Sequence, residues 1–193
     1  MKTDLPVRKS PRAAFYDYCE GDFFVTICTK EKEHSFGEIK SGIMKYTLTG
    51  HFCDIQLKEI PQHYPYAQVL VHQVMPNHLH AIIRIDPESL TGTHGSCDRR
   101  QENNIRIPQI RTLLGVVIGG IKRAVTMFAR RNGEEFSWQT RYHDHKIRGI
   151  SDGNMIWEYI EGNVQKWHED CFNRWDRNPD PFNIMGSRIS NGQ

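Results

Sequence analysis

The sequence predicts a single domain that combines β-strands with α-helices. Three runs rich in aromatic and β-branched residues have the composition of strands, and they cover residues 23–29, 69–74 and 78–85. Two later segments space their apolar residues helically, from about residue 108 to 131 and from about 154 to 168. The 193 residues are enough for one such domain with its own hydrophobic core and peripheral extensions.

In the first half of the chain, the strands flank a helix. The run at residues 23–29 is followed by a segment from about residue 47 to 60 with helical spacing, and Pro61 and Pro65 are expected to end that helix. Residues 75–77 interrupt the extended run before the third strand, because the proline among them cannot donate to a β-ladder. The second and third strands therefore form either a hairpin or one bent strand.

The second half of the chain begins with a polar stretch, residues 87–107, that is predicted to be a mobile loop. Pro108 opens the long helix that follows, since proline is tolerated in a first helical turn. Short extended structure is expected over residues 136–148. Ser151 and Asp152 are the candidate caps of the final helix.

Both ends of the chain are predicted to lie outside the domain, which spans residues 15–172. Residues 1–14 carry several basic side chains and two prolines with little apolar content, which is typical of a flexible basic arm. Residues 173–193 are polar and lack a clear periodicity, so they are predicted to form a C-terminal tail.

The composition excludes several classes of protein. The formal net charge of +2 means that any affinity for nucleic acid must come from a local basic patch. The five cysteines are scattered and include no Cys-x-x-Cys pair, which argues against a zinc ribbon and against a disulfide framework. The sequence shows no signal-peptide pattern and no apolar run of membrane length, so we expect a cytoplasmic protein without a membrane partner.

His78 and His80 are the most informative residues of the chain. Two histidines at positions i and i+2 project from the same face only where the backbone is extended, and the β-branched residues that follow indicate a strand that enters a core. Such a strand presents two neutral imidazole nitrogens side by side, as a divalent metal site requires. A hydrogen-bonded structural pair is the alternative interpretation.

Tyr159 and Asn163 are one turn apart on the final helix, so the phenol and the amide lie on the same helix face. A phenol with a pKa of about 10 is a poor nucleophile alone, but it can attack a phosphodiester that a bound cation polarises. Two imidazole nitrogens and an amide oxygen form a donor set that suits Mg²⁺ or Mn²⁺ as the cofactor. For Tyr159, an ordinary amphipathic tyrosine is the alternative.

Residues 75–80, Met-Pro-Asn-His-Leu-His, resemble the HUH signature (histidine, hydrophobic residue, histidine) of the single-tyrosine transposases. Within that family they resemble most of all the branch called REP-associated tyrosine transposases. Further stretches resemble the same family in the expected order, namely residues 23–29, 36–39, 138–148 and 159–170. The combination covers roughly residues 15–172 and is far more specific than any single piece.

This resemblance implies an α+β fold of ferredoxin-like (RRM-like) type, with a central antiparallel sheet, helices packed on one face and a C-terminal helix that bears the tyrosine. It also implies cleavage and transfer of single-stranded DNA, often beside a hairpin, through a 5′-phosphotyrosine. Tyr159 takes the place of the nucleophile, His78 and His80 those of metal ligands, and Asn163 that of a third polar ligand. Val164 stands where the family commonly has a proline, so the end of this helix departs from the pattern.

Two residues before the final helix are expected to support the site. Asp144 could orient a ligating histidine through its free ring nitrogen, or it could pair with Arg141 or Arg148 at the surface. Tyr142 competes with Tyr159 as the nucleophile and ranks below it, because its neighbours have the character of supporting polar groups.

Contacts with single-stranded or hairpin DNA must come from local basic groups. The candidates are Arg8, Lys9 and Arg12 in the arm and Lys122, Arg123, Arg130 and Arg131 on the long helix. A solvated helix face is the alternative for each of them. The family includes monomers as well as homodimers that supply the tyrosine helix across the interface, and the sequence allows a homodimer here.

Two other functions fit parts of the pattern. One is a metal-dependent phosphodiesterase that uses water as the nucleophile and holds zinc through histidines. Its candidate ligands are His63, His72, His78, His80 and His143. The other is a domesticated nucleic-acid-binding module on the same fold that has no catalytic activity.

Overall fold

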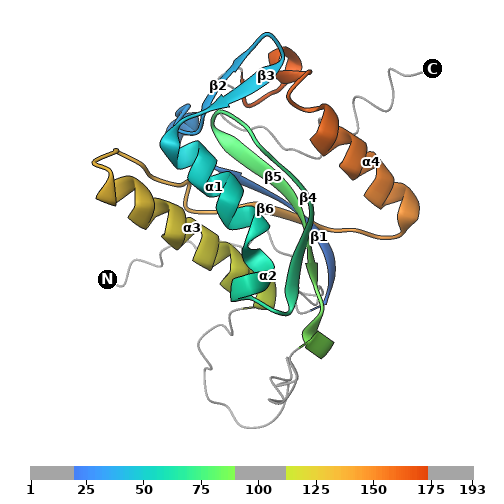
Figure 1. Ribbon diagram of the computed structural model, residues 1–193. Coiled ribbons are helices and arrows are strands. Elements are labelled where there is room, and N and C mark those ends of the chain that lie inside the picture. Colours follow the sequence, from blue (N-terminus) through green and yellow to red (C-terminus); the bar gives the residue numbers. More distant parts are fainter. Residues whose placement is uncertain (1–19, 90–111, 174–193) are drawn as a thin grey trace, which may run out of the picture.

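The computed structural model describes residues 20–89 and 112–173 (Figure 1). The predicted arm, most of the predicted loop 87–107 and the tail beyond residue 173 lie outside the described residues, so the predicted domain limits stay predictions. The basic candidates that lie outside with them are Arg8, Lys9 and Arg12. The start of the loop is described, and it forms a short 3-10 helix, η2 (Pro87–Ser89).

A four-stranded antiparallel sheet in the order β4-β5-β1-β6 forms the centre of the fold. Its strands are β1 (Gly21–Cys28), β4 (Ala67–Val74), β5 (His78–Ile85) and β6 (His143–Lys146). β4 and β5 pair antiparallel across the turn at residues 75–77, so the hairpin is the correct choice of the two arrangements. β1 pairs with β5 along its whole length, from Gly21 opposite Ile85 to Cys28 opposite His78.

The other elements surround this sheet. The helices are α1 (Leu48–Lys58), α2 (Ile60–His63), α3 (Leu113–Arg131) and α4 (Ile150–Gly162), with the 3-10 helices η1 (Lys30–Lys32) and η3 (Trp167–Glu169). A separate two-stranded hairpin pairs β2 (Gly37–Lys40) with β3 (Ile43–Tyr46). No helix within the described ranges is long and apolar enough to cross a membrane.

The structure refines the predicted boundaries of two helices. The helix predicted for residues 47–60 ends at Lys58, and Pro61 lies in the first turn of a separate short helix, α2, because a proline in a first turn sacrifices no helical hydrogen bond. The described part of α3 begins after Thr112, whose hydroxyl accepts a hydrogen bond of 3.1 Å from the backbone N–H of Gly115. Pro108 lies outside the described residues.

Helix α4 begins four residues before the predicted start near residue 154 and ends at Gly162. Its N-cap is Gly149, not Ser151 or Asp152. Gly149 has a φ of 92°, in the region that favours glycine, and this lets the chain turn sharply out of β6. Asp152 lies inside the first turn, where its carboxylate accepts a hydrogen bond of 2.8 Å from the backbone N–H of Arg148.

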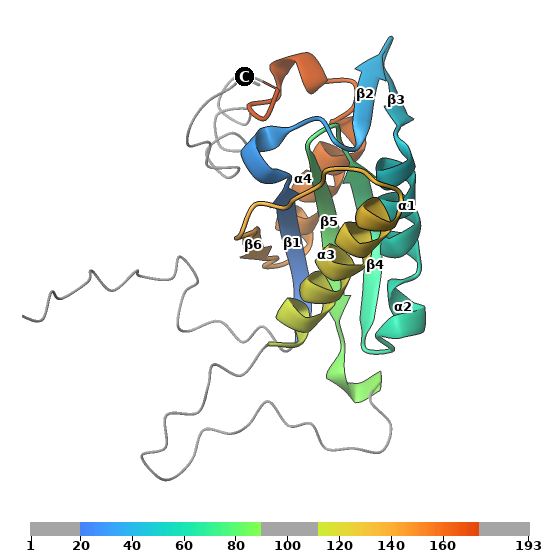
Figure 2. The same cartoon turned by 90° about the vertical axis from the view of Figure 1, so that its left-hand side faces the viewer.

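Helices α1, α2 and α3 cover one face of the sheet, and α4 packs on the other (Figure 1). Side chains alternate along each strand, so Phe23 and Val25 enter the core beneath α1 and α3, whereas Phe24 packs with Ile156 and Ile160 of α4. Figure 2 shows α3 crossing the near side of the sheet with α4 behind it. The order β1-α1-β4-β5-α3-β6 is the ferredoxin-like arrangement. The predicted α+β fold class is therefore confirmed.

Candidate metal centre

His78 and His80 lie on β5 with their side chains on the sheet face that α4 covers. In the register of the sheet, His78 is opposite Cys28 and His80 is opposite Thr26 of β1. Both histidines are 0% exposed. Each ring is held through Nδ1, which lies 2.8 Å from the Asn77 side-chain oxygen in His78 and 2.8 Å from the Thr26 hydroxyl in His80.

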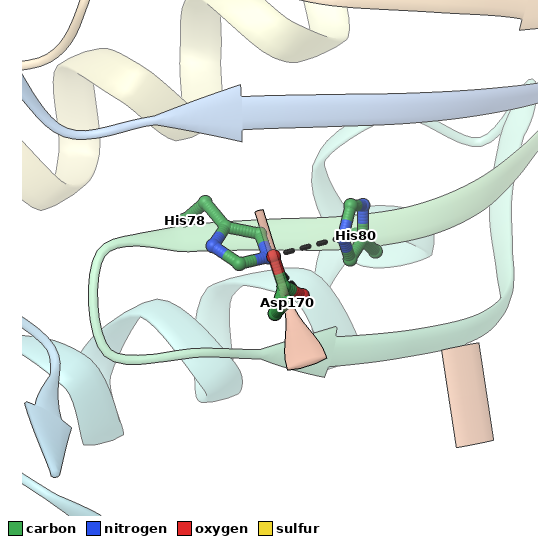
Figure 3. A group of neighbouring side chains, drawn as sticks. All are labelled: His78, His80 and Asp170. Atoms are coloured by element: carbon green, nitrogen blue, oxygen red, sulfur yellow. Dashed lines mark hydrogen bonds and ion pairs between the residues drawn. The ribbon is translucent and has the colours of Figure 1, made fainter. Parts of the chain in front are cut away.

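The remaining ring nitrogens of the two histidines converge with a buried carboxylate. The Nε2 atoms of His78 and His80 are 3.0 Å apart, and Oδ2 of Asp170 lies 4.0 Å from Nε2 of His78. Figure 3 shows both imidazoles and the carboxylate directed at one another. One ligand atom from each residue lies within 4.8 Å of the others, so this group could hold a metal ion.

Burial keeps both histidines in the neutral form that binds metals. It lowers the pKa of His80 to about 3. The pKa of His78 also lies well below its usual value, first because of burial and then because a charge on His80 would repel a charge on His78. Each neutral imidazole has one ring nitrogen with a free lone pair, which is the form of histidine that binds metals.

Tyr159 of α4 reaches this centre. Its neighbour Ile160 anchors α4 in the apolar contact with Phe24, and this places the phenol beside the histidines. The hydroxyl of Tyr159 lies 3.4 Å from Nε2 of His80, and the two ring centroids are 5.2 Å apart. The described residues thus bring a phenolic oxygen and the histidine pair together within one chain.

Asn163 caps the C-terminal end of α4 and is 0% exposed. Both its amide nitrogen and its amide oxygen are buried and have no hydrogen-bond partner among the described residues. A buried amide without partners costs free energy, which a bound ligand would recover. An oxygen donor in this state fits a metal centre with further open positions. Helix α4 ends at Gly162. Val164, which stands where the transposases that the sequence resembles commonly have a proline, lies in the turn that follows.

Asp170 is the functional candidate that sequence reasoning missed as a ligand. It lies in the turn after η3, eleven residues beyond Tyr159, and is 2% exposed. The only signal in the sequence was its place in the stretch that resembles the tyrosine helix of the family. The position of Asp170 in a loop did not predict its contact with β5, because no periodic sequence pattern relates that loop to the strand.

Tyr142 and Asp144 lie on the other face of the sheet, which corrects their expected role beside the histidines. Tyr142 packs against the core beneath α1 and α3. Asp144 is paired with Val25, whose side chain belongs to that same core, and paired residues of an antiparallel sheet share a face. The alternation along β6 therefore directs Asp144 away from His80.

The basic candidates on α3 also lie on the face opposite to the histidines. Arg123, Arg130 and Arg131 are exposed there. Lys122 is half-buried, and its ammonium donates to the backbone carbonyl of Gln139 at 2.6 Å. Burial lowers the pKa of Lys122. Its position thus favours a structural role over contact with a phosphate.

The histidines proposed as zinc ligands of a phosphodiesterase do not all lie at one site. Nε2 of His72 lies 2.9 Å from Asp54 of α1, on the α1 face of the sheet. His63 ends α2 on that same side. Within the described ranges, the group that could hold a metal contains His78, His80 and Asp170.

The fold and this centre define an α+β protein with a buried candidate metal site beside a tyrosine. No family model matches the sequence. A protein of Haemophilus influenzae (strain ATCC 51907 / DSM 11121 / KW20 / Rd), described as an uncharacterized protein, is 35% identical over 168 residues, which are 84% of this chain and 91% of that protein. The chain belongs to the same family as this protein.

A solved structure of a REP-associated tyrosine transposase, bound to a REP hairpin, is similar to this chain with a TM-score of 0.52. The match covers 82% of this chain and 74% of that one at 17% sequence identity. At this level of identity the likeness is one of fold. The fold expected from the resemblance in sequence is thus found in a solved transposase.

Proposed function

We propose that the protein is a metal-dependent transposase that cleaves single-stranded DNA and transfers the strand through a covalent 5′-phosphotyrosine on Tyr159. One observation carries this proposal: the hydroxyl of Tyr159 lies 3.4 Å from Nε2 of His80, and His80 belongs to the group of three residues that could hold a metal ion. A nucleophile beside a cation site is an arrangement that promotes phosphoryl transfer to a side chain, because the cation offsets the charge that develops on the phosphate oxygens.

In the proposed centre, His78, His80 and Asp170 hold the cation, and Asn163 adds an amide oxygen. The set mixes nitrogen and oxygen donors and contains no thiolate, which favours Mg²⁺ or Mn²⁺. A divalent ion in this position supplies positive charge to the phosphate oxygens when the phosphorus is attacked.

The chemistry balances without an external energy source. The oxygen of Tyr159 forms a bond to phosphorus, the bond from phosphorus to the 3′ oxygen of the upstream nucleotide breaks, and the phenolic proton ends on the released 3′-hydroxyl. The covalent link conserves the phosphodiester energy. Attack by another 3′-hydroxyl then reverses the step and frees Tyr159.

The proposed substrate is a single strand beside a hairpin. Two findings support this choice: the resemblance of residues 75–80 to the HUH signature, and the fold shared with a transposase that is bound to a REP hairpin. Arg8, Lys9 and Arg12 stay predicted phosphate contacts. We propose that the strand lies on the α4 side of the sheet, because Tyr159 is there and the exposed cations of α3 are not. A homodimer is compatible with this proposal, but Tyr159 reaches His80 of its own chain without one.

The decisive experiment incubates the protein with MnCl₂ and a labelled single-stranded oligonucleotide that carries a hairpin, followed by a denaturing gel. The wild-type protein should form a covalent adduct. Tyr159→Phe should abolish the adduct and keep hairpin binding, whereas the matched control Tyr142→Phe should form it. An adduct that persists in Tyr159→Phe and disappears in Tyr142→Phe contradicts the assignment of the nucleophile.

The same gel separates the other functions. Repeated cleavage that is activated by Zn²⁺ and leaves no covalent DNA would support a phosphodiesterase that uses water. Hairpin binding that survives alanine at His78 and His80, without any cleavage, would support a binding module.

A further inference from the structure

Asn77 occupies the turn between β4 and β5, directly before His78, and is 1% exposed. Its main-chain carbonyl accepts hydrogen bonds from the backbone N–H of Thr29 at 2.9 Å and from the Thr29 hydroxyl at 2.9 Å. The turn is thereby fixed through the backbone. The side chain is left to contact the residues around the metal centre.

The orientation of the Asn77 amide follows from its partners. The nitrogen Nδ2 donates to the carbonyl oxygens of Phe172, at 2.9 Å, and Lys32, at 3.2 Å. Both partners are acceptors only, so the amide cannot be reversed without losing two hydrogen bonds. The oxygen Oδ1 must therefore be the atom that faces Nδ1 of His78 at 2.8 Å.

This orientation fixes the tautomer of His78. An amide oxygen only accepts, so Nδ1 of His78 must carry the proton. Nε2 then has a bare lone pair, and it points at Nε2 of His80 from 3.0 Å. The partner of His80 is different, because the Thr26 hydroxyl at 2.8 Å either donates or accepts. In the metal-free protein, Nε2–H of His80 therefore donates to the bare Nε2 of His78. The Thr26 hydroxyl allows His80 to move its proton to Nδ1 when a cation binds, whereas His78 is restricted to one neutral form.

Asn77 also reaches the third member of the centre. The carbonyl that accepts from Nδ2 belongs to Phe172, and the backbone N–H of Phe172 donates to Oδ1 of Asp170 at 2.7 Å. The bond to Phe172 occupies one carboxylate oxygen of Asp170. The other oxygen, Oδ2, is the one that lies 4.0 Å from Nε2 of His78. One amide thus holds a histidine of β5 and, through one residue, a carboxylate of the C-terminal segment.

We propose that Asn77 is a positioning residue of the metal centre: it locks His78 in the Nδ1–H form and ties the segment of Asp170 to β5. The inference rests on the proposed function, because it assumes that the centre holds a divalent cation. Groups that orient metal ligands from behind change metal affinity by roughly 10- to 100-fold when they are removed.

The first test needs neither metal nor DNA. Long-range ¹H–¹⁵N NMR spectra of the histidine rings, recorded in EDTA at neutral pH, report which nitrogen carries the proton. His78 should be in the Nδ1–H form in the wild-type protein and in Asn77→Asp, whose carboxylate also accepts. Asn77→Asp cannot donate to the Phe172 carbonyl, so the Phe172 amide should exchange with deuterium faster than in the wild type. A wild-type His78 protonated on Nε2, or unchanged exchange at Phe172, would overturn the proposal.

The second test measures the affinity for Mn²⁺ alone by titration calorimetry, with the Mn²⁺ EPR signal as an independent reading. Asn77→Ala should weaken binding by roughly 10- to 100-fold. The matched control is Asn132→Ala, which removes an amide-to-carbonyl hydrogen bond of 2.9 Å at the end of α3, on the opposite face. The control should bind Mn²⁺ as tightly as the wild type, and an equal affinity in Asn77→Ala would refute the proposed role.

The two proposals fail separately. A folded wild-type protein that binds no Mn²⁺ contradicts the proposed function, while the tautomer of His78 still decides whether Asn77 acts as inferred. Thermal melting in EDTA shows whether Asn77→Ala folds. If it does not fold, the NMR and exchange measurements on the wild type and Asn77→Asp decide whether Asn77 acts as proposed.

Discussion

Two buried asparagines of this protein, Asn77 and Asn163, differ in whether their side-chain amides are hydrogen-bonded. Asn77 has every polar atom of its side chain in a hydrogen bond, whereas the amide of Asn163 has no partner among the described residues. The desolvation cost is therefore offset at Asn77 and uncompensated at Asn163. An uncompensated cost of this kind, one turn after Tyr159 on the same helix face, is expected of a functional residue rather than a structural one.

Replacing each asparagine by leucine should consequently change stability in opposite directions. Asn163→Leu removes a buried amide without partners and should raise the free energy of unfolding by about 1–2 kcal/mol. Asn77→Leu leaves two carbonyls and a ring N–H unpaired and should lower it by about 2 kcal/mol or more. Urea denaturation in EDTA, followed by circular dichroism, measures both. A loss of stability in Asn163→Leu comparable with that in Asn77→Leu would show that the Asn163 amide does have compensating partners.

The geometry favours Asp170 as a metal ligand, whereas the sequence predicted Asp144 as a residue that supports the histidines. Substitution of each aspartate tests which of the two acts on the metal. Asp170→Asn keeps the shape of the side chain and removes its charge, so the dissociation constant for Mn²⁺ should rise at least tenfold. Asp144→Asn, on the other face of the sheet, is the control and should leave the constant unchanged. The opposite ranking in titration calorimetry would restore Asp144 to the centre and remove Asp170.

At the level of elements, the contact between α4 and β6 positions the nucleophile. Asp152 in the first turn of α4 accepts from the ring of His145 at 2.9 Å and from the backbone N–H of Arg148 at 2.8 Å. Burial acts to raise the pKa of Asp152, but these hydrogen bonds outweigh it and the pKa lies below its usual value. The carboxylate thus joins the helix that carries Tyr159 to the edge strand of the sheet.

Removal of this carboxylate should loosen α4. We expect Asp152→Ala to lower the free energy of unfolding by about 1–2 kcal/mol, because two hydrogen bonds to a charged acceptor are lost. Glu158→Ala, at an exposed position of the same helix, should change it by less than about 0.5 kcal/mol. Thermal melting of the two variants side by side makes the comparison. Equal effects would mean that the bonds of Asp152 are not what secures the helix.

For the whole molecule, the buried neutral histidines make stability depend on pH. The pKa of His80 is about 3 in the folded state, and the ordinary pKa of histidine, which the unfolded chain has, is 6.5. Between these values the unfolded chain binds a proton that the folded chain does not. Stability is therefore complete above about pH 6.5 and is lost as the pH falls toward 3. His78, whose pKa is also lowered, acts in the same direction.

The free energy of unfolding, measured in EDTA, should thus fall steadily from pH 7 to pH 4. Each such histidine contributes up to about 1.4 kcal/mol per pH unit in this window. His80→Leu should reduce the slope, whereas His168→Leu, at an exposed position after α4, should leave it unchanged. An identical slope in all three proteins would mean that His80 does not remain neutral in the folded state.

Sequence reasoning succeeded where a local periodicity fixes geometry. The period of two along residues 78–85 predicted that His78 and His80 share a face, and the register of β5 with β1 puts them there. Apolar spacing predicted the helix of Tyr159, although the actual helix starts four residues earlier because Gly149 allows the turn. These properties depend on neighbours within a few residues, so the chain carries them without its tertiary contacts.

What the sequence determined by itself is therefore the set of strands and helices, the paired imidazoles and the phenol one turn from an amide. The tertiary structure alone decided which faces meet. It brought Asp170 to His78, turned Asp144 and the cations of α3 to the far side of the sheet, and gave Asn77 its partners on Phe172 and Lys32. The physical reason is that contacts between distant segments follow from how the buried faces pack, and no local pattern encodes the side of the sheet on which a loop will close.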